Sequence, residues 1–146
     1  MNKMWRKLFA ISALACMLCL TGLIMSGPAF AQQCVDNGDG TVTDNNTGKM
    51  WQKEPAVQMD YAAAIGYSVS LSLGGHSGWQ PPSKDELLDL SRSPCKNMMD
   101  LIPYFHWSYS RSGNDDQLAW YVDLKNGDAK LEKMSSRLFV RAVRYY

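Results

Sequence analysis

DNGDGTVTDNNTGKMWQ, at residues 36–52, is the stretch of sequence that decides how this chain folds. Its first five residues are turn formers, and residues 41–44 then alternate in side-chain character as a short strand does. A second turn follows at residues 45–48, and residues 49–52 supply the returning strand. The stretch therefore predicts an N-terminal β-hairpin.

The aspartates of this stretch invite comparison with a calcium-binding loop. An EF-hand loop has Gly at its sixth position and Glu at its twelfth. Counted from Asp36, those positions hold Thr41 and Thr47. The spacing therefore favours turn chemistry over calcium binding.

A first helix is predicted at residues 60–73. Tyr61, Ile65 and Val69 recur at helical spacing, which indicates an apolar stripe facing the core. Gly74-Gly75 should end this helix.

A second, short helix is predicted to start at Ser83. Glu86 stands three residues further on, which is the spacing of a capping box, and Leu87, Leu88 and Leu90 follow as its apolar residues.

The last third of the chain is predicted to be β-structure, because aromatic and β-branched residues dominate it. Asn126-Gly127 is a typical hairpin turn. Strands are expected at residues 104–110, 118–124, 129–134 and 138–143. The pattern predicts an α+β fold, with two helices followed by an antiparallel sheet.

Residues 1–31 have the features of a secretory signal peptide. Three basic residues lie within the first seven, and the apolar run at residues 8–25 carries no charge. Ala29-Phe30-Ala31 has the small-any-small pattern that predicts cleavage after residue 31. Two alternatives stay open: an uncleaved anchor, since about 20 apolar residues span a bilayer, and a lipoprotein modified at Cys16.

Cleavage leaves residues 32–146, which we expect to form one domain exported to the periplasm, the cell surface or the medium. The three basic residues leave with the signal while all 14 acidic residues stay, so the net charge changes from +1 to −2. Such a balance does not predict nucleic-acid binding, and no membrane contact is expected after cleavage. The oligomeric state stays open.

Cys34 and Cys95 are the two of four cysteines that follow residue 31. Two cysteines in an oxidising compartment suggest one disulfide. Two unpaired thiols are the alternative.

No catalytic, metal or cofactor site is predicted. Gly75-His76-Ser77-Gly78 resembles a nucleophile elbow, but that motif has Gly two residues after its Ser, where this chain has Trp79. His76 and His106 lie at no zinc-ligand spacing from another His or from a cysteine, so both are expected to be structural.

The polar loop at residues 109–117, between two predicted strands, is the first candidate for a ligand site. Aromatic rings there would stack on sugar rings, and polar groups would bond to sugar hydroxyls. The candidate residues are Trp107, Tyr109, Arg111, Asn114 and Asp116. The alternative site is a basic patch for an acidic polysaccharide, formed by Lys130, Lys133, Arg137, Arg141 and Arg144.

These blocks of sequence resemble the bacterial Lcl C-terminal domain family, named after the C-terminal domain of a collagen-like adhesin. The first block, at residues 36–53, is the most specific. The later blocks are Gly75-His76-Ser77-Gly78-Trp79 with Pro82 and Glu86-Leu87, then Trp107-Ser108, Ala119-Trp120, Val140-Arg141 and Val143-Arg144.

The resemblance implies a fold that is C-type-lectin-like in the broad sense, with two helices flanking an antiparallel sheet and the termini close together. In the named adhesin the domain is similar to a trimeric module that attaches to sulfated glycans, whereas most relatives have no assigned activity. The chain departs from the family at Gln80-Pro81-Pro82, where many members have Arg-Leu-Pro, and at Ala142, where many have Cys. It also has no collagen-like stalk and no calcium-ligating triplets.

The resulting hypothesis is a noncatalytic binding module that recognises a glycan or a cell-envelope protein. A structural envelope component is the alternative. A small enzyme is a further alternative, because the broad fold resembles that of formylglycine-generating enzymes. Those enzymes use a cysteine pair near the C-terminus, and no cysteine follows Cys95 here.

Overall fold

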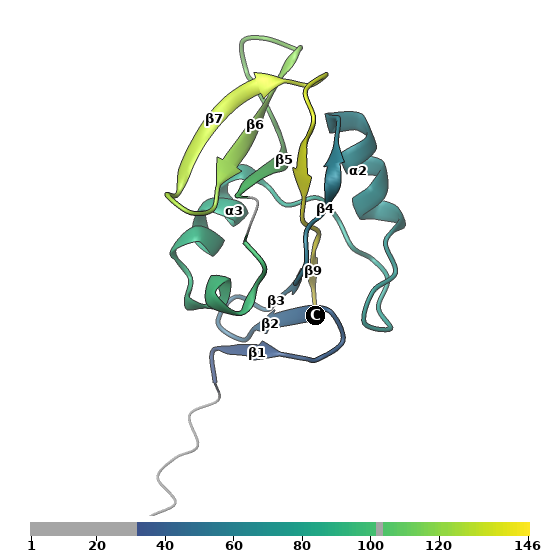
Figure 1. The fold of residues 1–146 in the computed structure, drawn as a ribbon, viewed down its shortest axis with the longest axis vertical. Coiled ribbons are helices and arrows are strands. Elements are labelled where there is room, and N and C mark those ends of the chain that lie inside the picture. The colour runs from purple at the N-terminus through teal and green to yellow at the C-terminus, as the bar shows by residue number, and fades with distance from the viewer. Residues whose placement is uncertain (1–31, 102–103) are drawn as a thin grey trace, which may run out of the picture. The chain divides into compact units, whose positions relative to one another are not determined.

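The computed structural model describes residues 32–101 and 104–146 (Figure 1). The predicted signal peptide lies outside these residues. The strands are β1 (Cys34–Asp36), β2 (Thr41–Asp44), β3 (Lys49–Gln52), β4 (Ala56–Met59), β5 (Phe105–Arg111), β6 (Leu118–Asp123), β7 (Asp128–Lys133), β8 (Leu138–Val140) and β9 (Val143–Tyr145). The helices are α2 (Tyr61–Ser70), α3 (Lys84–Arg92) and the 3-10 helix η1 (Pro94–Met98).

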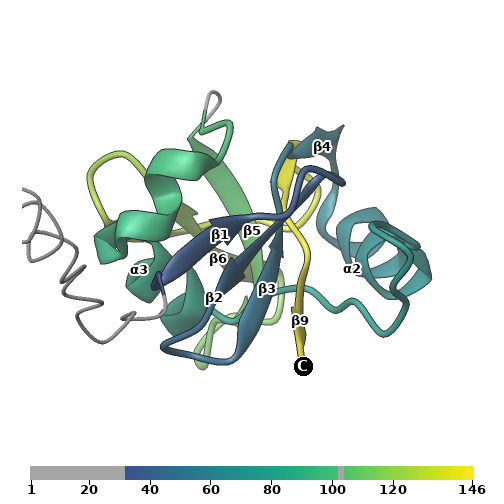
Figure 2. The same cartoon turned by 90° about the horizontal axis from the view of Figure 1, so that it is seen from below.

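The predicted N-terminal hairpin is confirmed as β2 and β3, which pair antiparallel with Val42 opposite Trp51. It is the centre of a four-stranded sheet in the order β1-β2-β3-β9. Strand β9 pairs with β3, so the last strand of the chain lies beside the first hairpin (Figure 2). Strand β1 was not predicted, because its three residues run directly into the turn formers.

The other five strands form a second sheet in the order β4-β8-β5-β6-β7. The single antiparallel sheet that we expected is therefore two sheets, and β5 and β8 pair parallel, with His106 opposite Phe139. The predicted strand at residues 138–143 is also divided, into β8 in one sheet and β9 in the other. Gln52 fixes Ala142, which lies between the two strands. The Gln52 backbone amide donates to the Ala142 carbonyl, and the Gln52 side-chain oxygen accepts from the Ala142 amide, both at 3.0 Å.

Helix α2 begins after Asp60, whose side chain accepts a hydrogen bond from the Ala63 amide. It ends at Ser70, before the glycines that we expected to end it. The predicted apolar stripe is correct for Tyr61 but wrong for Val69, which is 59% exposed. The buried residues are Tyr61, Ala64 and Ser68. Small side chains at the last two positions let the helix pack closely on β5 and β8.

Helix α3 begins where the capping box predicts, with both Ser83–Glu86 hydrogen bonds present. Its Leu87 and Leu90 pack with Val122 of β6 in one core cluster. Trp107 of β5 belongs to a different cluster, with Tyr61 of α2. Val122 is paired with His106, the residue before Trp107 on β5. Because successive residues of a strand point to opposite faces, Val122 and Trp107 lie on opposite faces of the five-stranded sheet, and so do the two helices that they contact (Figure 1).

The predicted disulfide between Cys34 and Cys95 is confirmed, with an S–S distance of 1.99 Å. It joins β1 to η1. Within the described parts of the chain, no helix is long and apolar enough to cross a membrane. The α+β class, the two helices and the N-terminal hairpin are as predicted; the likeness to C-type lectins stays a prediction.

Candidate functional site

The structure divides the residues of the first predicted ligand site. Trp107 is 2% exposed, and its indole N–H donates to the Met59 carbonyl at 3.0 Å, so its ring faces the core and offers no stacking surface. Tyr109 is 51% exposed. Arg111, Asn114 and Asp116 are exposed, Arg111 at the end of β5 and the other two in the following loop.

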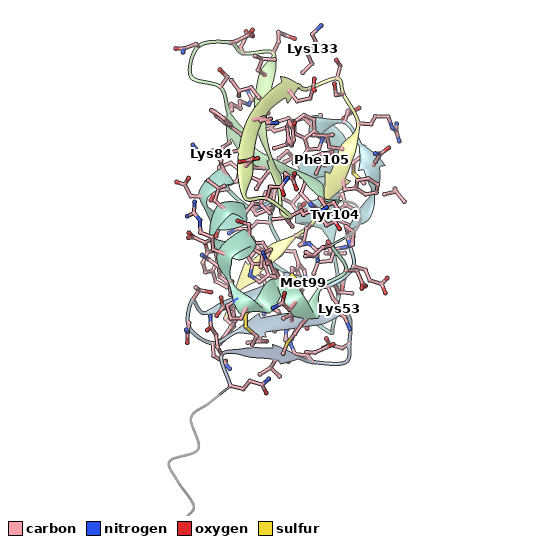
Figure 3. The ribbon with its side chains drawn as sticks, turned by 60° about the vertical axis from the view of Figure 1, so that its left-hand side comes forward. Lys53, Lys84, Met99, Tyr104, Phe105 and Lys133 are labelled. Carbon is pink, nitrogen blue, oxygen red and sulfur yellow. A yellow bond between two sulfur atoms is a disulfide. The ribbon has the colours of Figure 1, made fainter. Side chains whose placement is uncertain are left out.

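The five residues of the predicted basic patch do not come together. Lys130 and Lys133 are exposed on β7, where Figure 3 labels Lys133. Arg137 follows that strand and donates to the Gln58 carbonyl. Arg144 lies on β9, in the other sheet. Arg141 is the largest departure, because it is completely buried.

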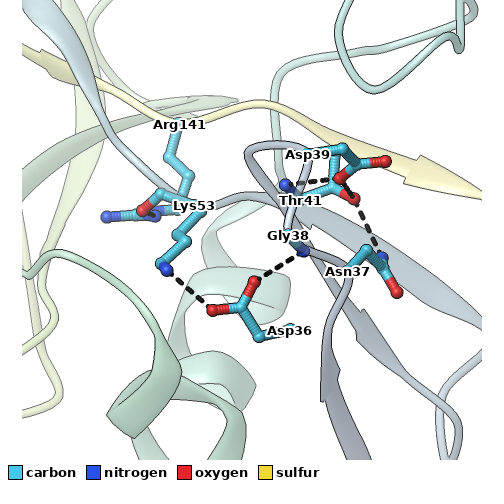
Figure 4. Close-up of polar contacts among 7 residues, drawn as sticks. All are labelled: Asp36, Asn37, Gly38, Asp39, Thr41, Lys53 and Arg141. Atoms are coloured by element: carbon cyan, nitrogen blue, oxygen red, sulfur yellow. Dashed lines mark hydrogen bonds and ion pairs between the residues drawn. The ribbon is translucent and has the colours of Figure 1, made fainter.

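Arg141 is a structural residue of the chain segment between β8 and β9. Its guanidinium donates hydrogen bonds to the carbonyls of Gln52, Lys53 and Asp100 (Figure 4 shows it beside Lys53). Burial lowers its pKa from 12.5 to about 10, which leaves it charged at neutral pH. A buried guanidinium with three carbonyl partners holds the end of β3 against the segment before β5.

The aspartates of the first turn bond to backbone and side-chain groups of the turn and to Lys53. Asp36 accepts from the Lys53 ammonium at 2.7 Å and from the Gly38 amide at 3.0 Å, and these bonds lower its pKa. Asp39 accepts from both the amide and the hydroxyl of Thr41 (Figure 4). Across residues 32–101 and 104–146, no cluster of His, Cys, Asp and Glu could hold a metal ion.

His106 is fully buried on β5, beside Arg141. One ring nitrogen, Nδ1, lies 2.9 Å from the Tyr104 carbonyl. Burial, helped by the positive charge of Arg141, lowers the pKa of His106 from 6.5 to about 3. The imidazole is therefore neutral, and Nδ1 carries the proton that it donates to Tyr104.

A cavity of about 640 Å³ opens at the surface between α2, the segment before α3 and the ends of β5 and β9. We call it the tyrosine pocket. Its lining residues are Tyr61, Ile65, Val69, Gln80, Pro81, Glu86, Tyr109, Arg111 and Tyr145. Two residues of the predicted loop site, Tyr109 and Arg111, therefore line it, whereas Asn114 and Asp116 do not.

Tyrosine side chains set the geometry of this pocket. The Tyr61 hydroxyl donates to the Tyr109 carbonyl at 2.6 Å, which fixes the end of β5 against α2. Tyr109 and Tyr145 are each about half exposed and present ring surface to solvent. The guanidinium of Arg111 lies 5.7 Å from the centroid of the Tyr61 ring. Arg111 forms no ion pair with any residue that the structure describes, so its charge is available to a ligand.

The charge of Glu86, in contrast, is already neutralised. One carboxylate oxygen accepts from the Ser83 amide at 2.8 Å, as part of the α3 cap. The other accepts from the Tyr145 hydroxyl and lies 3.7 Å from the Lys49 ammonium. The hydrogen bond to Glu86 is the main reason why the pKa of Tyr145 is raised to about 12.

Sequence reasoning missed Tyr61, Gln80, Glu86 and Tyr145 as pocket residues. Glu86 was recognised only as a cap, and Tyr61 only as a core residue. No local sequence pattern indicates that Tyr145 of β9 lies near Tyr109 of β5, because the two strands belong to different sheets.

The fold and pocket define the class of this protein: an α+β domain with a tyrosine-lined surface pocket. Comparison with known families agrees with the resemblance noted in the sequence. The family model described as the Lcl C-terminal domain matches residues 40–144, and the chain belongs to this family. No curated protein matches the chain.

Proposed function

We propose that this chain is an exported, noncatalytic binding module that recognises a carbohydrate through the tyrosine pocket. The observation that carries the proposal is the pair of half-exposed rings, Tyr109 and Tyr145, on the wall of one open cavity. Sugar rings present flat C–H faces, and aromatic side chains pack against them while their polar ends stay hydrated.

Polar groups around the rings support the same ligand class. The exposed amide of Gln80 can both donate to and accept from sugar hydroxyls. Arg111 adds a fork of donors with no competing ion pair among the described residues. A few placed polar groups beside aromatic surface are what a binding cavity of several hundred Å³ uses for orientation.

The residues of the pocket support catalysis less than they support carbohydrate binding. A general acid or base needs a free proton-transfer position within reach of substrate. The one carboxylate in the pocket, Glu86, accepts hydrogen bonds from Ser83 and Tyr145 and forms an ion pair with Lys49. The two histidines line no part of it.

A glycan array on the purified protein tests the proposal, followed by calorimetry on the sugars that bind. Removing the ring in Tyr109→Ala should weaken binding about tenfold, the lower end of the roughly 1–3 kcal/mol that a flat nucleobase gains by stacking on one aromatic ring. Phe105→Ala is the matched control: Phe105, labelled in Figure 3, lies on the same strand and is 47% exposed, and it does not line the pocket.

Equal loss in the Tyr109 and Phe105 variants would contradict a site at the tyrosine pocket. An array on which no glycan binds would contradict the carbohydrate assignment, and the protein partner of the original hypothesis would replace it.

A further inference from the structure

A second cavity adjoins the tyrosine pocket, and both are lined by Glu86. It has a volume of about 320 Å³ and lies between the β2–β3 hairpin and α3. We call it the α3 groove. The charged and amide residues that matter for its chemistry are Asp44, Asn46, Lys49, Asp89 and Arg92.

Glu86 lines both cavities, Tyr145 lines the tyrosine pocket, and Lys49 lines the α3 groove. Glu86 accepts from the Tyr145 hydroxyl and lies 3.7 Å from the Lys49 ammonium. That ammonium also lies 5.8 Å from the centroid of the Tyr145 ring. Tyr145 is 52% exposed, so a polymer packed on its ring can continue from the tyrosine pocket into the α3 groove along one surface.

Asp44 gives the groove a group that lacks donors. Its side chain is almost entirely buried, at 4% exposed, yet it lines the cavity. Within the described residues its carboxylate accepts one hydrogen bond, from the Asn46 amide at 3.0 Å. A carboxylate has room for about four donors, and the second oxygen of Asp44 has no donor among the described residues but is not fully buried, so it is open to the groove. Donors that enter the groove would therefore bind to Asp44.

The charge of the groove decides which donors fit. Three acidic residues line it, and Glu86 among them is paired with Lys49. Asp44 and Asp89 remain without an ion pair in the part of the chain that the structure describes, against Arg92 alone. An acid group placed there would meet a like charge, whereas a hydroxyl or ammonium group would find acceptors.

We infer that the α3 groove is an extension subsite of the tyrosine pocket, which binds a further ring of the same saccharide. This ring carries hydrogen-bond donors, hydroxyl or ammonium, and no acid group. The inference rests on the proposed carbohydrate function and adds to it that the ligand is an oligosaccharide whose far ring is not acidic.

Calorimetry with defined oligomers tests this inference on the full chain. The probes are the dimers and tetramers of glucosamine, N-acetylglucosamine and galacturonic acid. At least one of the first two tetramers should bind about tenfold more tightly than its dimer, and the galacturonate tetramer should gain less than twofold over its own dimer. A gain for glucosamine alone identifies ammonium as the donor, and a gain for N-acetylglucosamine identifies hydroxyl or amide groups.

Asp44→Asn is the decisive variant, because Asn keeps the acceptor for the Asn46 amide but loses the charge. It should weaken tetramer binding about tenfold, as expected for a hydrogen bond to a charged group, and leave dimer binding unchanged. Asp85→Asn is the matched control, since Asp85 is exposed on α3 and lines neither cavity. If Asp44→Asn does not fold, Asp89→Asn gives the same readout from the other side of the groove.

Three results would overturn the inference. The first is a tetramer that binds no better than its dimer while Tyr109→Ala still weakens the dimer, which leaves the proposed function intact. The second is an equal effect of the Asp44 or Asp89 variant and the Asp85 control. The third is no binding by any oligomer of the two non-acidic sugars; a negative glycan array in addition would also remove the proposed function.

Discussion

The hydroxyl of Tyr145, next to the C-terminal residue, donates a hydrogen bond to the carboxylate of Glu86, 59 residues earlier in the chain. Glu86 uses its other oxygen to cap α3 through the Ser83 amide. One side chain therefore completes a helix cap and fixes an aromatic wall of the tyrosine pocket. The start of α3 and the position of β9 are coupled through it.

Replacement of Glu86 by Gln should lower the pKa of Tyr145 from about 12 toward the ordinary 10. The reason is that a phenolate beside a carboxylate is disfavoured, and Gln removes the negative charge. The ultraviolet titration of the tyrosines measures the change, and Tyr145→Phe identifies which step of the titration belongs to this residue. A late-titrating tyrosine that persists in Glu86→Gln would contradict the assignment.

Removal of the disulfide should cost about 4 kcal/mol of unfolding free energy, from the chain-entropy model for a bridge with a separation of 61 residues. Urea unfolding of the Cys34→Ser, Cys95→Ser double variant measures it. The unreduced protein should also be two hydrogens lighter in mass spectrometry than the reduced one. Wild-type protein unfolded in the presence of reductant is the control and should match the double variant; an unchanged free energy would contradict a stabilising role for the bridge.

The parts of the fold that the sequence predicted are those decided by neighbouring residues. The β2–β3 hairpin follows from two turns with a strand on each side, and α3 follows from Ser83 and Glu86 at a fixed spacing. The disulfide follows from the two cysteines after residue 31, Cys34 and Cys95. The hairpin and the helix cap depend on residues a few positions apart, and two cysteines can form only one disulfide.

The parts that the sequence did not predict depend on distant partners. The rotation of α2, which exposes Val69, is set by how Tyr61 packs edge-on against Trp107, with ring centroids 5.8 Å apart. The division of residues 138–143 into two strands is set by Gln52, 90 residues before Ala142. The tyrosine pocket joins α2, β5 and β9 in the same way, so that only Tyr109 and Arg111 were found beforehand.

Arg141 also shows why charge alone misassigns a basic residue to a surface patch. Arg141→Met should lower the unfolding free energy by about 4 kcal/mol, because three buried carbonyls would lose a charged donor. Arg144→Met is the control, since Arg144 is only partly buried and donates one bond, to Ser77; its cost should be below about 1 kcal/mol. Chemical denaturation of both variants measures the difference. Similar unfolding free energies would contradict the structural role of the Arg141 guanidinium.

His106 should make the protein less stable as the pH falls below 6.5. Its folded-state pKa is lowered to about 3, whereas the unfolded chain binds a proton near 6.5. Between these values the unfolded state holds the extra proton, so acid favours unfolding, by about 1.4 kcal/mol for each pH unit. From pH 7 to pH 5 this residue should therefore contribute a loss of roughly 2 kcal/mol.

Urea unfolding at pH 7, 6 and 5 measures this loss by comparison with His106→Asn, whose amide can donate the same bond to Tyr104. The carboxylates titrate alike in both proteins, so the difference between the two pH dependences isolates the imidazole. If the Asn variant does not fold, the ring resonances of His106 in the wild-type protein give the answer, because they should keep the shifts of a neutral imidazole with the proton on Nδ1 down to pH 5. Equal pH dependences, or a ring that gains a proton near pH 6.5, would contradict the lowered pKa that we expect from the burial of His106 beside Arg141.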